Sequence, residues 1–284
     1  MSERIINKTL LTAFEEYLLR EEKSIATVEK YLRDSLAFVL YAEGKKLTKD
    51  LTVGYKKSLE ETGYKPRSVN SMIASLNSFL EFIGAADCKV KTVRIQKSIY
   101  LAEEKELTKD EYKKLLAAAK HKEKLSLVIR TICSTGIRVS ELKYFTVEAV
   151  RKGDVTVNCK SKTRTIIVPG DLQRLLLRYA TKHGISEGSI FITRNGKTLD
   201  RSYIWAQMKG LCESAGVNPS KVFPHNLRKL FARVFYNIEK DISKLADILG
   251  HSNIETTRIY IMTTGSEHRR QIEKMGLALI GSFT

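Results

Sequence analysis

The chain of 284 residues lacks several features that would each indicate a particular class of protein. No apolar run approaches the roughly 18 residues of a membrane span, and no signal peptide is expected before the first predicted helix. Internal repeats and low-complexity tracts are also lacking. The four cysteines form no CxxC pair, which argues against a zinc site or a disulfide framework and predicts reduced thiols in a cytoplasmic protein. They are Cys88, Cys133, Cys159 and Cys212.

Acidic residues are scarce relative to basic ones. The chain carries 49 Lys and Arg against 32 Asp and Glu, which gives a formal net charge of +17 and a pI near 9.6. Residues 1–100 have 17 basic and 13 acidic residues (+4), whereas residues 101–284 have 32 and 19 (+13). This excess predicts a polyanionic partner that binds mainly the second part of the chain. A solvated basic surface without a partner is the alternative.

The first part of the chain, residues 1–86, is predicted to be a small bundle of about four helices. Apolar residues recur at helical spacing over residues 9–20 and most clearly over residues 69–83, where Gly84 ends the pattern. A polar corner precedes the last of these helices and is a candidate for contact with phosphate, with a solvated helix start as the alternative. Its candidate DNA-binding residues are Lys65, Arg67, Ser68 and Asn70.

Residues 87–106 are predicted to be a linker, because they lack sustained periodicity and mix basic with acidic residues. Thr108 and Glu111 then have the spacing of a capping box, which predicts the first helix of a second domain over residues 107–284. The end of that domain, residues 266–284, contains an amphipathic segment and is predicted to be a docking tail.

A buried helix is predicted over residues 125–133 of this second domain. Gly136 breaks the helical pattern and lets a new helix begin, with Arg138 near its start and Glu141 one turn later. Taken alone, an Arg–Glu pair of this kind is more often structural than functional.

Two segments rich in β-branched residues, 155–159 and 165–168, are predicted to pair as a hairpin that Pro169 ends. The connection from Lys160 to Arg164 makes the tip of this hairpin densely basic.

The segment near the C-terminus concentrates the residues that carry chemistry. His225 and Arg228 are followed by an amphipathic helix over residues 241–249, which Gly250 is predicted to end in a left-handed conformation. His251 is thereby held at a sharp corner.

Ser252 and Glu255 have capping-box spacing, so a further short helix is predicted to place Tyr260 about two turns beyond them. A histidine, a tyrosine and a nearby arginine can then converge on one small anionic group. Each of these residues alone is more often part of an ion pair or a core, and only their combination is specific.

In this order the motifs resemble those of the tyrosine recombinases, the phage integrase family. The matching elements are Thr-Gly-Ile-Arg138-x-Ser-Glu141-Leu, the basic hairpin, His225-x-Leu-Arg228, Leu-Gly-His251 and Tyr260. The chain length is similar to that of compact Xer-type members, and the resemblance extends over nearly the whole chain. It implies a mainly α fold with a small β-sheet: an N-terminal helical core-binding domain and a C-terminal mixed α/β tyrosine-recombinase catalytic domain.

The resemblance implies that Arg138 and Arg228 hold the non-bridging oxygens of a scissile DNA phosphate. Guanidinium groups suit this task because their planar fork matches phosphate geometry and keeps its charge. Tyr260 is then the nucleophile that forms a 3′-phosphotyrosine and releases a 5′-hydroxyl.

The remaining site residues handle protons in the same scheme. His225 is expected to assist the loss of the phenolic proton, and His251 to donate a hydrogen bond to the phosphate. Lys160 is expected to protonate the leaving oxygen, with Lys162 as the open alternative, and Glu141 to brace the first arginine.

The function implied is a site-specific DNA recombinase that acts on double-stranded DNA as a homotetramer, without a metal or nucleotide cofactor, in the cytoplasm on the nucleoid. Integration, excision and resolution all remain open. A type IB topoisomerase and a non-catalytic DNA-binding regulator are the alternatives. One departure from many relatives is Lys229, which stands where they have a histidine.

Overall fold

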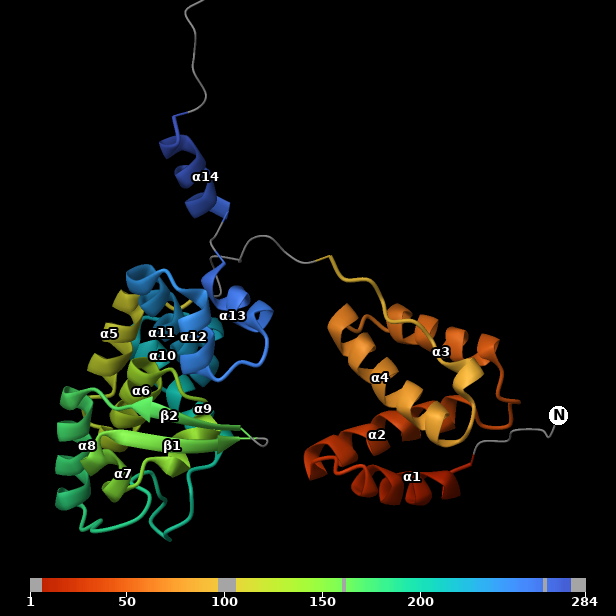
Figure 1. Ribbon diagram of the computed structural model, residues 1–284, viewed down its shortest axis with the longest axis horizontal. Helices are drawn as coiled ribbons and strands as arrows, with labels where there is room; N and C mark the ends of the chain where they lie inside the picture. The colour runs from red at the N-terminus through yellow and green to blue at the C-terminus, as the bar shows by residue number, and fades with distance from the viewer. Residues whose placement is uncertain (1–6, 97–105, 160–161, 263–264, 277–284) are drawn as a thin grey trace, which may run out of the picture. The chain divides into compact units, whose positions relative to one another are not determined.

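The computed structural model describes residues 7–96, 106–159, 162–262 and 265–276, and it divides the chain into two compact units (Figure 1). These units are Met1–Lys97 and Ser98–Thr284, and each contains its own apolar core. Helices predominate and the only described sheet has two strands, so the predicted fold class is confirmed. Over the described residues, no helix combines the length and apolarity needed to cross a bilayer.

The first unit is a bundle of four α-helices, as the apolar periodicity predicted. Its core is formed by apolar residues from all four helices and includes Phe14, Phe38, Leu59 and Phe79. The helices are α1 (Thr9–Arg20), α2 (Ile25–Tyr41), α3 (Lys49–Glu61) and α4 (Pro66–Phe82), and a short 3₁₀ turn, η1 (Ala86–Cys88), follows them.

The chain beyond η1 is held against α4 by two asparagine side chains. The Asn77 amide donates to the Val90 carbonyl and accepts from the Val90 N–H, both at 2.9 Å. The Asn70 amide makes the same pair of bonds with Val93, at 2.9 and 2.7 Å. The residues just after α4 therefore pack as part of the first unit.

The second unit is built around α6 (Glu123–Thr135), a buried helix that packs against α8, α9 and α11. The predicted buried helix over residues 125–133 is confirmed. The other helices are α5 (Lys109–Ala118), η3 (Val139–Tyr144), α7 (Val147–Lys152), α8 (Gly170–Lys182), α9 (Arg201–Lys209), α10 (Cys212–Ala215), η4 (Pro219–Lys221), α11 (Pro224–Glu239), α12 (Ile242–Leu249), α13 (Ile254–Ile261) and α14 (Gly265–Lys274).

The predicted hairpin is present, although its second strand begins earlier than expected. Strands β1 (Asp154–Cys159) and β2 (Lys162–Ile167) are antiparallel, with Val157 opposite Arg164 and Cys159 opposite Lys162. The charge of the basic run predicts that all of it lies at the tip. Arg164 is instead a strand residue opposite Val157, and its side chain forms an ion pair with buried Glu141.

Two predicted helix starts have different outcomes. The Thr108 and Glu111 capping box is present in full at the start of α5. The predicted box of Ser252 and Glu255 is wrong, because the Asn253 side chain caps α13 by accepting from the Glu255 N–H at 2.8 Å. Asparagine competes well with serine at such a position because its carbonyl oxygen reaches the same N–H groups.

Candidate active site

Arg228 lies one turn into α11 and is 1 % exposed. Its guanidinium donates to the Gly136 carbonyl at 2.5 Å and to the Leu249 carbonyl at 2.7 Å. These carbonyls belong to the C-terminal ends of α6 and α12, where Gly136 and Gly250 adopt left-handed conformations with φ of 66° and 65°. Because helix C-termini carry partial negative charge, two of them together stabilise a buried cation.

Arg138 and Glu141 come together as the sequence predicted, at the start of η3. The Glu141 carboxylate is 2 % exposed and accepts from the Arg138 N–H at 2.7 Å and from its Nη1 at 3.1 Å. It also accepts two bonds from Arg164 of β2, at 2.7 and 3.0 Å. The carboxylate therefore lies between two arginines from separate elements.

His251 follows Gly250 at the corner between α12 and α13. Its Nε2 lies 2.9 Å from Arg228 Nη2, and its Nδ1 lies 2.8 Å from Thr257 Oγ1. Because a guanidinium can only donate, Nε2 is the acceptor, and the proton of the neutral ring is on Nδ1 and directed to Thr257. In the unbound site, the corner thus sets the position of the imidazole and favours the tautomer protonated on Nδ1.

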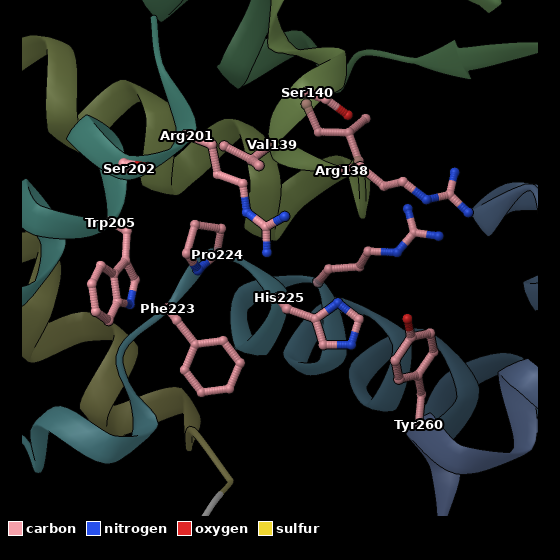
Figure 2. A pocket seen from close by; sticks show the side chains of 12 residues that line it. Arg138, Val139, Ser140, Arg201, Ser202, Trp205, Phe223, Pro224, His225 and Tyr260 are labelled. Atoms are coloured by element: carbon pink, nitrogen blue, oxygen red, sulfur yellow. The ribbon is translucent and has the colours of Figure 1, made fainter. Parts of the chain in front are cut away.

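Tyr260 of α13 is buried against Ala232, Leu245 and Leu249. Its ring centre lies 5.3 Å from that of His225 and also 5.3 Å from that of His251. The tyrosine therefore sits between the two histidines. Figure 2 shows Arg138, His225 and Tyr260 around one pocket of 490 Å³, which Arg228 also lines.

The surroundings of the two histidines favour their neutral forms. Desolvation, and then the positive charges of Lys229, Arg228, Arg138 and Arg201, lower the pKa of His225 from 6.5 to about 4. Desolvation, followed by Arg228, Arg138 and Arg164, lowers the pKa of His251 to about 4 as well. Desolvation also lowers the pKa of Arg228 to about 10, so this guanidinium stays charged at neutral pH. At neutral pH the pocket thus combines fixed cations with neutral imidazoles.

Within the described ranges, no group of three or more His, Cys, Asp or Glu side chains is arranged to hold a metal ion. The positive charges at the pocket come instead from arginine side chains, whose forked donors suit an oxyanion such as a phosphodiester.

Comparison with known proteins identifies the family to which this fold belongs. The model of the Phage integrase family matches residues 105–267, and that of the family's N-terminal SAM-like domain matches residues 11–86. The chain belongs to the phage integrase family. It is a tyrosine-type site-specific DNA recombinase, as the order of its motifs implied.

Individual relatives agree with this assignment. The recombinase is 31% identical to tyrosine recombinase XerA of Pyrococcus horikoshii, over 97% of this chain and 96% of that protein. It is 29% identical to XerA of Pyrococcus furiosus, over 98% and 97%.

Solved structures show the same fold. A crystal structure of XerA recombinase matches at 25% identity with a TM-score of 0.54, over 94% of this chain and 98% of that one. A lambda integrase dimer bound to a COC′ core site matches at 18% identity with a TM-score of 0.72, over 91% and 96%.

The structure brings together six of the residues that the sequence singled out. They are Arg138, Glu141, His225, Arg228, His251 and Tyr260. Lys160 lies outside the described residues. Lys162 is described only by its backbone, which begins β2 opposite Cys159.

The N-terminal candidates lie in the first unit of the recombinase, at the start of α4. Lys65, Arg67 and Ser68 are exposed there. Both polar atoms of the Asn70 side chain are instead bonded to the backbone of Val93.

Two arginines at the site were not given a role from the sequence. Arg201 begins α9 and lines the pocket, where Figure 2 shows its side chain directed into the same space as His225. Arg164 pairs with Glu141. No local signal identified either residue, because each reaches the site across more than 20 residues of sequence.

We expect Lys229→Gln to raise the pKa of His225 above about 4, because Lys229 is the largest of the nearby charges that lower it. The amide retains a hydrogen-bond donor toward Glu106, whose carboxylate lies 3.6 Å from the lysine Nζ. Titration of ¹⁵N-labelled histidine by NMR, with His225→Gln to assign the signal, measures the shift. Lys113→Gln, a change at an exposed lysine of α5, is the control. An unchanged or lower pKa in Lys229→Gln contradicts this account.

Proposed function

We propose that Tyr260 attacks a scissile DNA phosphate and forms a 3′-phosphotyrosine, releasing a free 5′-hydroxyl. The observation that carries this proposal is the convergence of two arginines and two histidines around one buried tyrosine ring. Rejoining by the reverse reaction on a partner strand completes recombination. The bond energy is retained in the phosphotyrosine, so the cycle needs no nucleotide cofactor.

Arg138 and Arg228 are assigned to the non-bridging oxygens of the phosphate. Attack by the phenolate produces a pentacoordinate transition state with additional negative charge, which fixed cations stabilise. Arg228 is suited to this task because two helix ends already hold its guanidinium in place. Little reorganisation is then required during the reaction.

His225 is assigned to accept the phenolic proton of Tyr260. Its pKa of about 4 in the unbound site keeps the ring neutral at physiological pH. The negative charge of a bound phosphate offsets the neighbouring cations and raises that pKa, which makes the ring a stronger base.

His251 is assigned as a donor to the phosphate. In our proposal Arg228 turns one N–H from His251 toward a phosphate oxygen, and His251 takes the tautomer protonated on Nε2. The Thr257 hydroxyl, 2.8 Å from Nδ1, then donates to the nitrogen that has lost its proton.

Replacing Tyr260 by Phe tests the nucleophile directly. The variant keeps the ring that packs against Ala232, Leu245 and Leu249, so we expect normal folding and DNA binding but no covalent adduct. Adducts are measured on a nicked duplex in denaturing gels, and peptide mass mapping locates the attachment site in the wild type. A denaturation-resistant adduct in Tyr260→Phe shows that another residue is the nucleophile.

The leaving 5′-oxygen requires a proton, which we assign to Lys160 on the hairpin, with Lys162 as the alternative. We expect Lys160→Ala to abolish cleavage of ordinary DNA. Cleavage should return on a substrate with a 5′-bridging sulfur, because a thiolate leaves without protonation. The paired Lys162→Ala variant decides the register: rescue by sulfur in Lys162→Ala and not in Lys160→Ala transfers the role to Lys162.

We further propose that both units bind duplex DNA, with residues 1–86 as the core-binding domain, residues 87–106 as its linker and residues 107–284 as the catalytic domain. The net charge of +17 supports this arrangement, since neutralising phosphates releases counterions. Lys65, Arg67 and Ser68 are exposed at the start of α4 and are assigned to backbone contacts. We leave Asn70 out of this set because its amide is already bonded to Val93.

We propose that four copies assemble on two duplexes through the tail, each docking its tail on the next copy. Ile272 of α14 and Met275 just after its end are 54% and 62% exposed, so this segment presents apolar surface. A complementary apolar groove of 430 Å³ lies between α5, α6 and α11. It is lined by Lys109, Tyr112, Lys113, Cys133, Ser134, Leu230, Phe231, Val234, Phe235 and Ile238.

Deleting residues 266–284 tests this assembly. We expect the truncated recombinase to bind a single half-site normally but to form no synaptic complex and no recombinant product. Ile238→Glu should have the same effect, because Ile238 is 75% exposed and a charge there disrupts the groove without entering the core. Half-site binding and recombination are compared by native gel assays.

Lys240→Glu places a glutamate at an exposed position near the groove but outside its lining, and it serves as the control. Recombination at the wild-type level by the truncated protein refutes docking on a neighbour. Loss of half-site binding by the truncated protein shows instead that the tail packs on its own domain.

A further inference from the structure

The principal partner of the buried Glu141 carboxylate is Arg164, a residue of β2. Arg164 Nη1 lies 3.0 Å from Oε1 and Nη2 lies 2.7 Å from Oε2, so the two side chains form a forked pair. Arg138 contributes a single side-chain bond of 3.1 Å and its backbone N–H. Forked guanidinium–carboxylate pairs are both stronger and more directional than single bonds.

This division of bonds determines how much of Arg138 is available. A free carboxylate beside a phosphate-binding arginine competes with the phosphate for the guanidinium. With Arg164 occupying both oxygens of Glu141, Arg138 stays 37% exposed and lines the pocket. The cluster contains three guanidinium groups, those of Arg138, Arg164 and Arg228, and one carboxylate, that of Glu141. It therefore keeps a formal charge of +2 for an incoming anion.

Arg164 also contacts the corner that carries His251. A Cβ atom added at Gly250 would lie 2.6 Å from Arg164 Nη1 and 2.9 Å from its Cδ, so only glycine fits over this side chain. The Gly250 carbonyl in turn lies 3.4 Å from Arg138 Nη2. Arg164 therefore contacts both Glu141, which bonds Arg138, and the Gly250 corner that carries His251. Its own side chain is only 14% exposed.

A purely stabilising ion pair is the simpler explanation, and two observations count against it. Buried ion pairs add little net stability, because desolvation of both charges offsets their attraction. The Nε of Arg164 is moreover buried without a hydrogen-bond partner among the described residues, which is a further cost. If packing were the only role of this position, an apolar side chain would fill the same space at a lower cost in free energy.

We propose that Arg164 is a positioning residue of the recombinase: it binds both oxygens of Glu141 so that Arg138, held by a single side-chain bond, stays available to the scissile phosphate, and it supports the Gly250–His251 corner. The proposal rests on the roles assigned above to Arg138 and His251. The proposal gives the hairpin a second role in the site through Arg164 of β2. This role does not depend on which hairpin lysine is the general acid.

The test is a double-mutant cycle on single-turnover cleavage of a nicked half-site. In Arg164→Met, Glu141 loses its forked partner and captures Arg138, so we expect cleavage to fall by ~10²-fold, the usual effect of losing one transition-state donor. Adding Glu141→Gln removes the competing charge. We therefore expect the double variant to cleave at least about 10-fold faster than Arg164→Met, a recovery that a structural role would not produce.

Arg174→Met is the matched control, since it removes another arginine paired with a carboxylate, Asp171, at an exposed position of α8. Half-site affinity should be equal in Arg164→Met and Arg174→Met. If Arg164→Met lowers the melting temperature strongly, Arg164→Lys takes its place, because it keeps the charge but cannot form the fork. The same cleavage loss and the same rescue by Glu141→Gln are then required.

Three results overturn the proposal. The first is cleavage by the Arg164 variant at the level of Arg174→Met. The second is no recovery of cleavage when Glu141→Gln is added. Either result refutes the positioning role alone. The third is wild-type cleavage by Arg138→Met, measured in parallel, which refutes the assignment of Arg138 and with it the basis of this inference.

Discussion

The burial of the Arg228 charge is the constraint on which the site depends. A guanidinium withdrawn from water is costly unless its donors find partners of opposite polarity. Here the partners are carbonyls at the ends of α6 and α12, and both helices end in glycines with positive φ that expose those carbonyls. One side chain of α11 thus ties together three helices that are distant in sequence. The cost of burying the charge is met by the same contacts that fix its position.

The rest of the site follows from this anchor. Because α12 ends against Arg228, the corner at Gly250 places His251 beside the same guanidinium, and α13 then brings Tyr260 between two imidazoles. Desolvation, and then the excess of cationic over anionic groups in the unbound site, lowers the pKa of both histidines. In the proposed reaction, the phosphodiester supplies the missing negative charge. The excess of positive charge would then favour both DNA binding and the transition state.

The sequence anticipated much of the fold because the relevant signals are local. Apolar periodicity gave the four helices of the first unit and the buried α6, and the Thr108 and Glu111 spacing gave a helix start. The errors lie where two local solutions compete. Asn253 caps α13 in place of Ser252. Strand β2 begins at Lys162, so Arg164 lies in the strand ladder opposite Val157 and not in the turn that its charge suggested.

The sequence by itself determined the fold class and singled out the residues that are proposed to carry the chemistry, since motif order and helical spacing are properties of neighbours along the chain. Only the tertiary structure decided which partners those residues bond to. It assigned Glu141 to Arg164 across 23 positions, Arg228 to Gly136 across 92, and the amide of Asn70 to Val93. Such pairings depend on how helices and strands pack, and on the need to satisfy each buried polar group, which no local pattern records.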